Sequence, residues 1–260
     1  MVIRVAVARA TGKLGSIVCD LVADDPELEL TGAVVSSGGG HEGESIHGVA
    51  AVGPDGLDRV LKDCDVYVDL TSPEATEAII GRASDSGAGI VLGTTSVRGE
   101  ALEEMARNIR KRGSSAVVSA NFSIGVNVFW KVCETMAGYL PDYDIEVVEM
   151  HHGDKKDAPS GTAAEAIRRL QKATGIEKVV YGRKGAAGPR QREIGVHSVR
   201  GGDIVGDHTV MFAKNMEILE LTHRAISRES LAEGCIQSIK WVAARKDGEV
   251  HSMSEVLGLC

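Results

Sequence analysis

The sequence predicts an α/β fold, in which a mostly parallel sheet carries helices on both faces, followed by a second α+β domain. Strand-like apolar runs alternate with helical segments through the first part of the chain, the order that produces a parallel sheet. A glycine-containing turn joins the first strand to the first helix. Later, three strand-like runs follow one another, which is typical of a mixed or antiparallel sheet. We expect one domain over residues 1–121 and 231–260, and a second over 122–230.

Composition restricts the partners of this chain. Its 260 residues carry a formal net charge of −8, which argues against nucleic acid or an acidic membrane as partner. No apolar run approaches the roughly 18 residues of a spanning helix, and the chain enters a strand directly, so no signal peptide is expected. Five scattered cysteines without a Cys-x-x-Cys motif indicate free thiols in a reducing cytoplasm.

The elements of the first domain follow from apolar runs and helix signals. Ser72 and Pro73 are typical of a helix start, with the serine as cap and the proline in the first turn. Strands are expected at 2–8, 28–35, 64–71, 90–92 and 116–119, and helices at 16–23, from Ser72, at 99–112 and at 230–244. The last of these helices and the tail at 255–257 are expected to return to the first domain.

The first turn has the context of a dinucleotide fingerprint, because Arg9-Ala10-Thr11-Gly12-Lys13-Leu14-Gly15 lies between a strand and a helix. In such a doubly wound (Rossmann-like) sheet, ligands bind beyond the carboxyl ends of the strands. Gly93-Thr94-Thr95 ends another strand and is expected to face the same crevice. The loop from Ser36 to His41 has no acid before Glu42, which favours acceptance of a 2′-phosphate and so of NADPH. A flexible surface loop is the alternative there.

A polar loop, His151–Thr162, is expected between a strand at 143–150 and a helix at 163–173. The helix is expected to open at Ser160-Gly161-Thr162, with residues 162–165 matching a capping box. Free N–H groups and the positive dipole end at a helix start favour an anion such as a carboxylate. Strands at 179–181, 194–200, 203–212 and 216–224 complete the second domain.

The loop also carries groups suited to proton transfer. His151 and His152 titrate near neutral pH, and Lys155 and Lys156 supply positive charge. Each group alone also fits a structural role, but together they indicate a small anionic substrate that is protonated during turnover. A metal site of His151, His152 and Asp154 is the alternative. Adjacent histidines of a strand point to opposite faces, however, and lysines repel a cation, so no metal is expected.

The run from Glu146 to Ala163 reads Glu-x-x-Glu-x-His-His-x-x-Lys-x-Asp-Ala-Pro-Ser-Gly-Thr-Ala. It closely resembles the signature of the dihydrodipicolinate reductase (4-hydroxy-tetrahydrodipicolinate reductase) family. In that family the first histidine and the lysine form an acid/base pair, and the second histidine and the helix start hold the substrate. The resemblance therefore implies His151 and Lys155 as catalytic residues, and His152, Ser160, Gly161 and Thr162 as substrate-binding residues.

The resemblance extends to the first domain and implies that it binds the cofactor. The implied cofactor-binding residues are Arg9, Ala10, Thr11, Gly12, Lys13, Leu14, Gly93, Thr94, Thr95, Ser119, Ala120, Asn121 and Phe122. Two positions depart from the family pattern. Arg9 replaces the first glycine of the turn, and Ser96 replaces the last glycine of Gly-Thr-Thr-Gly. The arginine puts the cofactor affinity in question.

The family implies the reduction of 4-hydroxy-tetrahydrodipicolinate, a small dicarboxylate, with NADPH and/or NADH in the diaminopimelate route of lysine biosynthesis. It also implies a cytoplasmic homotetramer joined through the sheet of the second, substrate-binding domain. Two alternatives remain: another nicotinamide-dependent imino-acid reductase, or a non-catalytic dinucleotide-binding regulatory protein.

Overall fold

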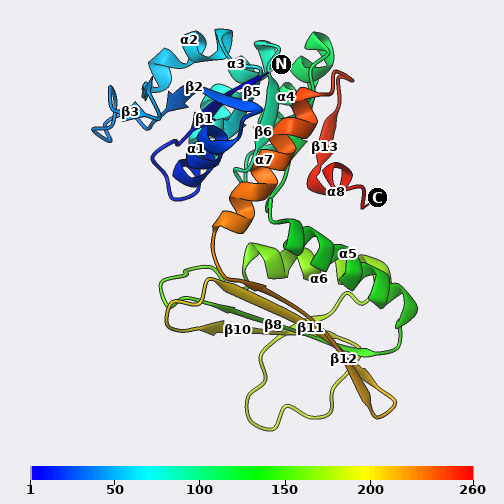
Figure 1. Ribbon diagram of the computed structural model, residues 1–260. Coiled ribbons are helices and arrows are strands. Elements are labelled where there is room, and N and C mark those ends of the chain that lie inside the picture. Colours follow the sequence, from blue (N-terminus) through cyan, green and yellow to red (C-terminus); the bar gives the residue numbers. More distant parts are fainter. Residues whose placement is uncertain (1, 260) are drawn as a thin grey trace. The chain divides into compact units, whose positions relative to one another are not determined.

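The computed structural model describes residues 2–259, and Figure 1 shows the chain as two compact units. The first unit contains the chain up to Ile124 and the chain from Glu229 onward, and the second unit is Gly125–Arg228. Of the five cysteines, Cys260 lies outside the described residues, and the other four are free and buried.

The first unit is built on a six-stranded sheet of order β13-β7-β6-β5-β1-β2. All its strands pair in parallel. The strands are β1 (Ile3–Ala8), β2 (Leu28–Val34), β5 (Val66–Asp69), β6 (Gly89–Leu92), β7 (Ala116–Val118) and β13 (Val250–Ser252). In this order β1 lies between β5 and the edge strand β2, so the turn that follows β1 lies at the carboxyl edge of the sheet, between the ends of those two strands.

Helices cover both faces of this sheet, which is why its strands are apolar on both sides. Val5 and Val7 of β1 pack in one core, and Ala6 and Ala8 pack in the core of the opposite face. The first core is closed by α1 (Gly15–Asp24), α7 (Glu229–Ala243) and α8 (Met253–Val256), and the second by α2 (Leu57–Lys62), α3 (Pro73–Asp85) and α4 (Gly99–Arg112). The doubly wound fold predicted from the sequence is confirmed.

In the first unit, the predicted start of α3 is confirmed, whereas the short elements that follow β2 were not predicted. Ser72 caps α3, since its side chain accepts a hydrogen bond from the N–H of Ala75, and Pro73 is the first helical residue. The segment after β2 contains a small hairpin, β3 (Ser45–Ile46) and β4 (Val49–Ala50), and a 3₁₀ turn at Pro54–Gly56. These short elements and α2 were not expected from the sequence.

The second unit contains a five-stranded mixed sheet of order β12-β11-β8-β10-β9. Strand β8 pairs in parallel with β10 and antiparallel with β11. Figure 1 shows α5 (Ile124–Tyr139) and α6 (Gly161–Thr174) lying along one face. The strands are β8 (Asp144–His151), β9 (Val179–Tyr181), β10 (Ile194–Arg200), β11 (Gly206–Lys214) and β12 (Glu217–Ala225).

Two details of the second unit correct the sequence expectations. His151 is the last residue of β8 and does not lie in the loop. The cap of α6 is Ser160, whose side chain accepts a hydrogen bond from Ala163 N–H, so the capping box expected at residues 162–165 is wrong. Glu165, the glutamate of that box, instead pairs with arginines of its own helix.

Candidate active site

Glu149 and His151 form the centre of the candidate site in the second unit. They lie on the same face of β8, because side chains two residues apart on a strand point to the same side. Both are buried, and Nδ1 of His151 lies 2.5 Å from Oε2 of Glu149. A carboxylate can only accept, so Nδ1 donates, and Nε2 is the ring nitrogen that can exchange a proton.

Arg200 fixes the charge of Glu149. It is the register partner of His151 on β10, and its guanidinium donates to both oxygens of Glu149, at 2.7 and 3.0 Å. Ser160 N–H donates to the same carboxylate at 3.3 Å. Burial opposes ionisation of Glu149, but the hydrogen bonds, led by that from Arg200, hold the pKa of its carboxyl below the usual value. Glu149 is thus a buried anion with fixed donors.

The pKa of the His151 imidazole is affected by burial and by three neighbouring charges. Burial has the largest effect, and it lowers the pKa. Glu149 acts in the opposite direction, while the positive charges of Lys155 and Arg200 lower the pKa further. The net effect is a pKa below the usual value for histidine, so the ring is neutral at pH 7 until another anion approaches.

His208 on β11 forms the wall beside His151. It is the register partner of Glu149, and its ring meets that of His151 edge-on, with centroids 5.1 Å apart. Its Nε2 lies 3.0 Å from Oγ of Ser160. Burial, followed by the proximity of His151, lowers the pKa of His208 to about 4. His208 is therefore a neutral packing and hydrogen-bonding group at pH 7.

Glu149, His151 and His208 each offer a ligand atom, and these atoms lie within 4.8 Å of one another. That spacing alone would suit a metal ion. The oxygens of Glu149, however, already accept hydrogen bonds from Arg200, Ser160 and His151. A metal would have to displace a guanidinium and lie beside its positive charge, which is unfavourable. The chemistry of this donor set favours proton transfer.

The loop after β8 carries Lys155, whose positive charge acts on His151. Nζ of Lys155 lies 2.8 Å from Oδ1 of Asp157. His152 is half-buried, and its carbonyl oxygen accepts a hydrogen bond from the N–H of Lys155 at 3.2 Å. Of the two residues expected to form the acid/base pair, His151 is thus buried and Lys155 lies at the rim.

The start of α6 offers space for an anion. Gly161 is exposed, and a side chain begun there would meet no atom within 4 Å. Ser160 satisfies the N–H of Ala163, and the carbonyl oxygen of Thr162 accepts a hydrogen bond from Trp130 at 2.9 Å. The first turn of the helix is therefore anchored from behind, and its glycine leaves the backbone accessible.

Three residues of this cluster were not among the expected site residues: Glu149, Arg200 and His208. Glu149 precedes His151 by two positions on a predicted strand, so the alternation alone would have placed the two side chains together. Arg200 and His208 come from strands far along the sequence, and no local pattern connects them to His151.

The turn after β1 has glycines at the positions where a dinucleotide-binding turn requires close packing of the backbone. The N–H of Gly12 donates to the carbonyl oxygen of Arg9 at 2.8 Å. A Cβ at Gly12 would lie 2.7 Å from Cγ of Arg9, and one at Gly15 would lie 2.1 Å from the Arg9 carbonyl oxygen. Both glycines are therefore required for this close turn, the type of turn that lets backbone approach a pyrophosphate. Ala10 is buried, Thr11 and Lys13 are exposed, and Leu14 is half-buried.

Both departures from the family pattern lie in the left-handed region of backbone conformation. Arg9 has φ +63° and Ser96 has φ +59°, where a residue with a side chain is strained and glycine is not. The Arg9 side chain extends toward β5, with Nη1 3.4 Å from the carbonyl oxygen of Thr71. The structure thus explains in backbone terms why glycine suits these two positions.

The other expected cofactor segments lie at the carboxyl ends of β6 and β7. A Cβ at Gly93 would lie 2.7 Å from Cδ2 of Leu70 and 3.0 Å from the ring of Phe122, so any larger residue there would require these side chains to shift. Ser119 donates from Oγ to the carbonyl oxygen of Asn121 at 2.7 Å. Ala120 and Thr95 are exposed. Because β7, β6, β5 and β1 are neighbours, these segments and the first turn share one edge of the sheet.

Asp69 is a further buried group at this edge that the sequence did not single out. It is the last residue of β5 and has 0% exposure. Its Oδ1 accepts from the hydroxyls of Thr71 and Thr94, at 2.6 and 3.2 Å. Asp69 thereby fixes the orientation of Thr94, one of the expected cofactor residues.

Comparison with known proteins decides the family. The N-terminal domain model of dihydrodipicolinate reductase matches residues 3–122, and the C-terminal domain model matches residues 125–257. The chain belongs to the dihydrodipicolinate reductase family. This confirms the family that the signature loop predicted.

Members of the family resemble the chain over its whole length. The 4-hydroxy-tetrahydrodipicolinate reductase of Methanosarcina mazei is 41% identical and covers 99% of this chain and 100% of its own. That of Methanocaldococcus jannaschii is 42% identical, covering 99% and 98%. A dipicolinate-bound dihydrodipicolinate reductase from Paenisporosarcina sp. TG-14 has the same fold, with a TM-score of 0.80, 26% identity, and 98% and 99% coverage. No helix among the described residues is long and apolar enough to cross a membrane.

Proposed function

We propose that the chain is an NAD(P)H-dependent reductase that converts 4-hydroxy-tetrahydrodipicolinate to tetrahydrodipicolinate in the diaminopimelate route of lysine biosynthesis. The observation that carries the proposal is the coincidence of a full-length family match with a buried Glu149–His151 pair beside Lys155. The overall change takes up a hydride and a proton and releases water.

The start of α6 binds a carboxylate of the substrate in this proposal. Gly161 and Thr162 supply backbone N–H groups at the positive end of a helix dipole, and the Thr162 hydroxyl adds a donor. Ser160 holds the turn in shape through its cap. Lys155 and His152 add positive charge and hydrogen-bonding capacity at the rim, which suits a substrate with two carboxylates.

His151 and Lys155 supply the proton in this proposal. The neutral His151 ring has its Nδ1–H engaged by Glu149, so proton exchange takes place at Nε2. The two negative charges of an approaching substrate raise the imidazole pKa again and favour a protonated ring. The ring and the Lys155 ammonium then deliver a proton to the reduced substrate, while a bound nicotinamide supplies the hydride.

The cofactor is held by the carboxyl edge of the first sheet. The turn from Arg9 to Leu14 takes the pyrophosphate, and the segments at Gly93–Thr95 and Ser119–Phe122 complete the site. We favour NADPH, with NADH as the second possibility. Glu44 pairs with His41 at 2.9 Å, and the carboxylate of Glu42 lies against Gly53. Glu44 is thus paired within its own loop, and residues 35–41, which follow β2 directly, contain no acid that could take the ribose as in an NADH-selective site.

A cytoplasmic homotetramer is also part of the proposal. The sheet of the second unit has helices on one face only, and Ile218 of β12 and Val199 of β10 are 64% and 43% exposed. Apolar side chains on an uncovered sheet face are suited to packing against another copy. Free buried thiols fit a reducing compartment.

The test is the loss of absorbance of the reduced nicotinamide with 4-hydroxy-tetrahydrodipicolinate as substrate, measured with NADPH and with NADH. We expect substrate-dependent oxidation that falls by about 10² to 10⁴-fold in His151→Gln and in Lys155→Ala. Oxidation with a different cyclic imine only would indicate another imino-acid reductase. Cofactor binding without oxidation of any imine would indicate a regulatory protein.

A further inference from the structure

Glu149 is more completely enclosed than the side chain it contacts. Its side chain has 0% exposure, against 11% for that of His151. Each of its oxygens is engaged: Oε1 accepts from Arg200 and Ser160, and Oε2 accepts from Arg200 and His151. A buried carboxylate in this setting is too enclosed to act as a ligand for substrate. It meets the proposed site at two points, Nδ1 of His151 and the backbone N–H of Ser160, and only the first belongs to a group that transfers a proton.

That bond determines which nitrogen of His151 carries hydrogen. Neutral imidazole has one donor and one acceptor nitrogen. A carboxylate at 2.5 Å from Nδ1 requires the hydrogen there, which directs the lone pair of Nε2 away from Glu149. A Cβ placed at Gly206 would lie 3.1 Å from Nε2, so the glycine at the start of β11 leaves space next to the nitrogen that exchanges the proton.

Arg200 stabilises the buried Glu149 carboxylate by neutralising its charge, and it also binds the loop that joins β8 to α6. Besides its two bonds to Glu149, Nη2 of Arg200 donates to the carbonyl oxygen of Asp157 at 2.7 Å. The loop backbone between β8 and α6 is therefore attached to the same guanidinium that neutralises Glu149. His208 on the other side carries no charge at pH 7, so Glu149, Arg200 and Lys155 are the charges that act on the His151 ring.

We propose that Glu149 is a positioning residue, held by Arg200, that fixes His151 as the Nδ1–H tautomer and so makes Nε2 the proton-transferring atom. This inference rests on the proposed function, in which His151 moves the proton. Glu149 does not touch the substrate, and a glutamine in its place keeps an oxygen that can accept from Ser160 N–H. Glu149→Gln therefore changes the turnover number and its pH dependence and leaves substrate affinity nearly unchanged.

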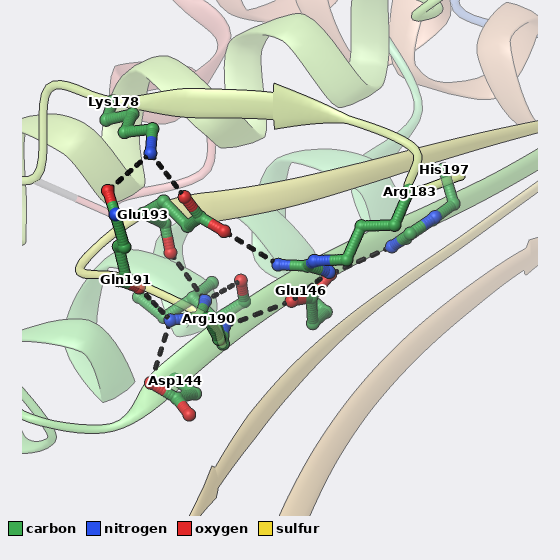
Figure 2. Close-up of polar contacts among 9 residues, drawn as sticks. Asp144, Glu146, Lys178, Arg183, Arg190, Gln191, Glu193 and His197 are labelled. Atoms are coloured by element: carbon green, nitrogen blue, oxygen red, sulfur yellow. Dashed lines mark hydrogen bonds and ion pairs between the residues drawn. The ribbon is translucent and has the colours of Figure 1, made fainter. Parts of the chain in front are cut away.

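The same strand offers a matched control. Figure 2 shows Glu146 on β8 at the centre of a second carboxylate cluster, where its side chain accepts hydrogen bonds from His197, Arg183 and Arg190 at 2.8, 3.1 and 3.2 Å. Glu146 lies three positions before Glu149 on the strand, so their side chains point to opposite faces of the sheet. Glu146→Gln thus removes a glutamate from a Glu–His–Arg cluster without altering the neighbours of His151.

The experiment compares Glu149→Gln with Glu146→Gln in the full chain. The ring nitrogens of His151 are followed by ¹⁵N NMR without substrate, and kcat and KM are measured across pH. We expect Glu149→Gln to lose the Nδ1–H tautomer, because the Gln amide can donate to Nδ1. We expect kcat to fall by about 10²-fold while KM changes by less than about threefold. The alkaline fall of kcat/KM should begin at a lower pH than in the wild type, since Glu149 raises the pKa of His151.

A double-mutant cycle separates positioning from folding. In the His151→Gln background, Glu149→Gln should cause no further loss of kcat, because residues that act as a unit are not additive. Glu149→Asp retains the charge and should recover part of kcat and the tautomer. It also serves as the measured variant if Glu149→Gln does not fold.

Three outcomes would overturn the inference: an unchanged tautomer in Glu149→Gln, equal losses in Glu146→Gln and Glu149→Gln, or a full additional loss in the double variant. Failure of the proposed function is recognised separately. A wild type that oxidises no cofactor with the imine refutes that proposal, while the NMR measurement still decides whether Glu149 sets the tautomer.

Discussion

Nζ of Lys155 lies 2.8 Å from Oδ1 of Asp157, two residues further along the loop that joins β8 to α6. The hydrogen bond from Lys155 is the main cause of the lowered pKa of Asp157. Asp157 is therefore ionised at neutral pH. The proposed substrate carries two carboxylates, and Asp157 therefore competes with one of them for the ammonium group.

We predict that Asp157→Asn binds the flat analogue pyridine-2,6-dicarboxylate several-fold more tightly than the wild type. The exposed ion pair stabilises the fold by at most about 1 kcal/mol, so the free energy of unfolding should change little. Titration calorimetry gives the affinity. Asp154→Asn is the matched control, since it removes an exposed acid of the same loop. An equal gain in both variants would mean that general charge, and not release of Lys155, improves binding.

Arg9→Gly should lower the dissociation constants of NADPH and NADH by a similar factor. Arg9 extends toward Thr71 after β5, whereas the 2′-phosphate of a dinucleotide lies beyond β2, on the other side of β1. The side chain is therefore placed over the pyrophosphate turn, which both cofactors share. Calorimetric titration of each cofactor decides the matter, and a selective loss of NADPH affinity would show that Arg9 contacts the 2′-phosphate instead.

The same substitution should also stabilise the fold. Relief of the left-handed strain at Arg9 is worth up to about 1 kcal/mol after the greater flexibility of glycine in the unfolded chain is allowed for. Ser96→Gly should give a comparable gain, because its φ is similar. Urea unfolding of each variant measures this. A gain in stability without a change in cofactor affinity would separate backbone strain from crowding of the site.

Gly206→Ala should slow turnover by roughly tenfold, because its methyl group would press on Nε2 of a ring that Glu149 holds from the other side. The strand itself should tolerate alanine. The control is Gly201→Ala, where a Cβ meets no atom within 4 Å. Steady-state kinetics of both variants provide the comparison, and wild-type turnover in Gly206→Ala would mean that the ring has room to move.

The stability of the protein should fall as the pH drops from about 6.5 toward 4, with His208 as one cause. Burial lowers its pKa to about 4 in the fold, so the unfolded chain takes up a proton at a higher pH than the native one. The contribution of the neutral ring to the free energy of unfolding is complete above pH 6.5 and is lost as the pH falls to about 4. This contribution is on the order of 3 kcal/mol.

Urea unfolding at several pH values tests this, with His208→Gln expected to flatten the dependence. His251 is the control of opposite sign, because its pKa is raised; burial opposes that rise, but bonds to Glu255 and Asp247 outweigh it. Its contribution is present at low pH and is lost as the pH rises. His251→Gln should therefore leave the loss below pH 6.5 in place, and an unchanged slope in His208→Gln would refute the prediction.

The architecture of the first unit and the chemical groups of the signature loop could both be predicted from the sequence. The run around Val5 and Val7 predicted a buried strand, and the turn at Gly12 was expected from its place between that strand and a helix. The loop signature predicted the family, which the comparisons confirm. Ser72 and Pro73 predicted the start of α3 correctly, whereas the cap of α6 was misplaced, because Ser160 and Thr162 are both good caps and local sequence does not rank them.

The assembly of the candidate site, in contrast, depends on contacts between strands that are distant in sequence. Alternation along β8 places Glu149 and His151 on one face, but it does not say what lies opposite. The pairing of β8 with β10 brings Arg200 beside His151, and its pairing with β11 brings His208 beside Glu149. Strand pairing of this kind depends on side-chain packing between segments distant in sequence. The charge balance around His151 therefore exists only in the folded sheet.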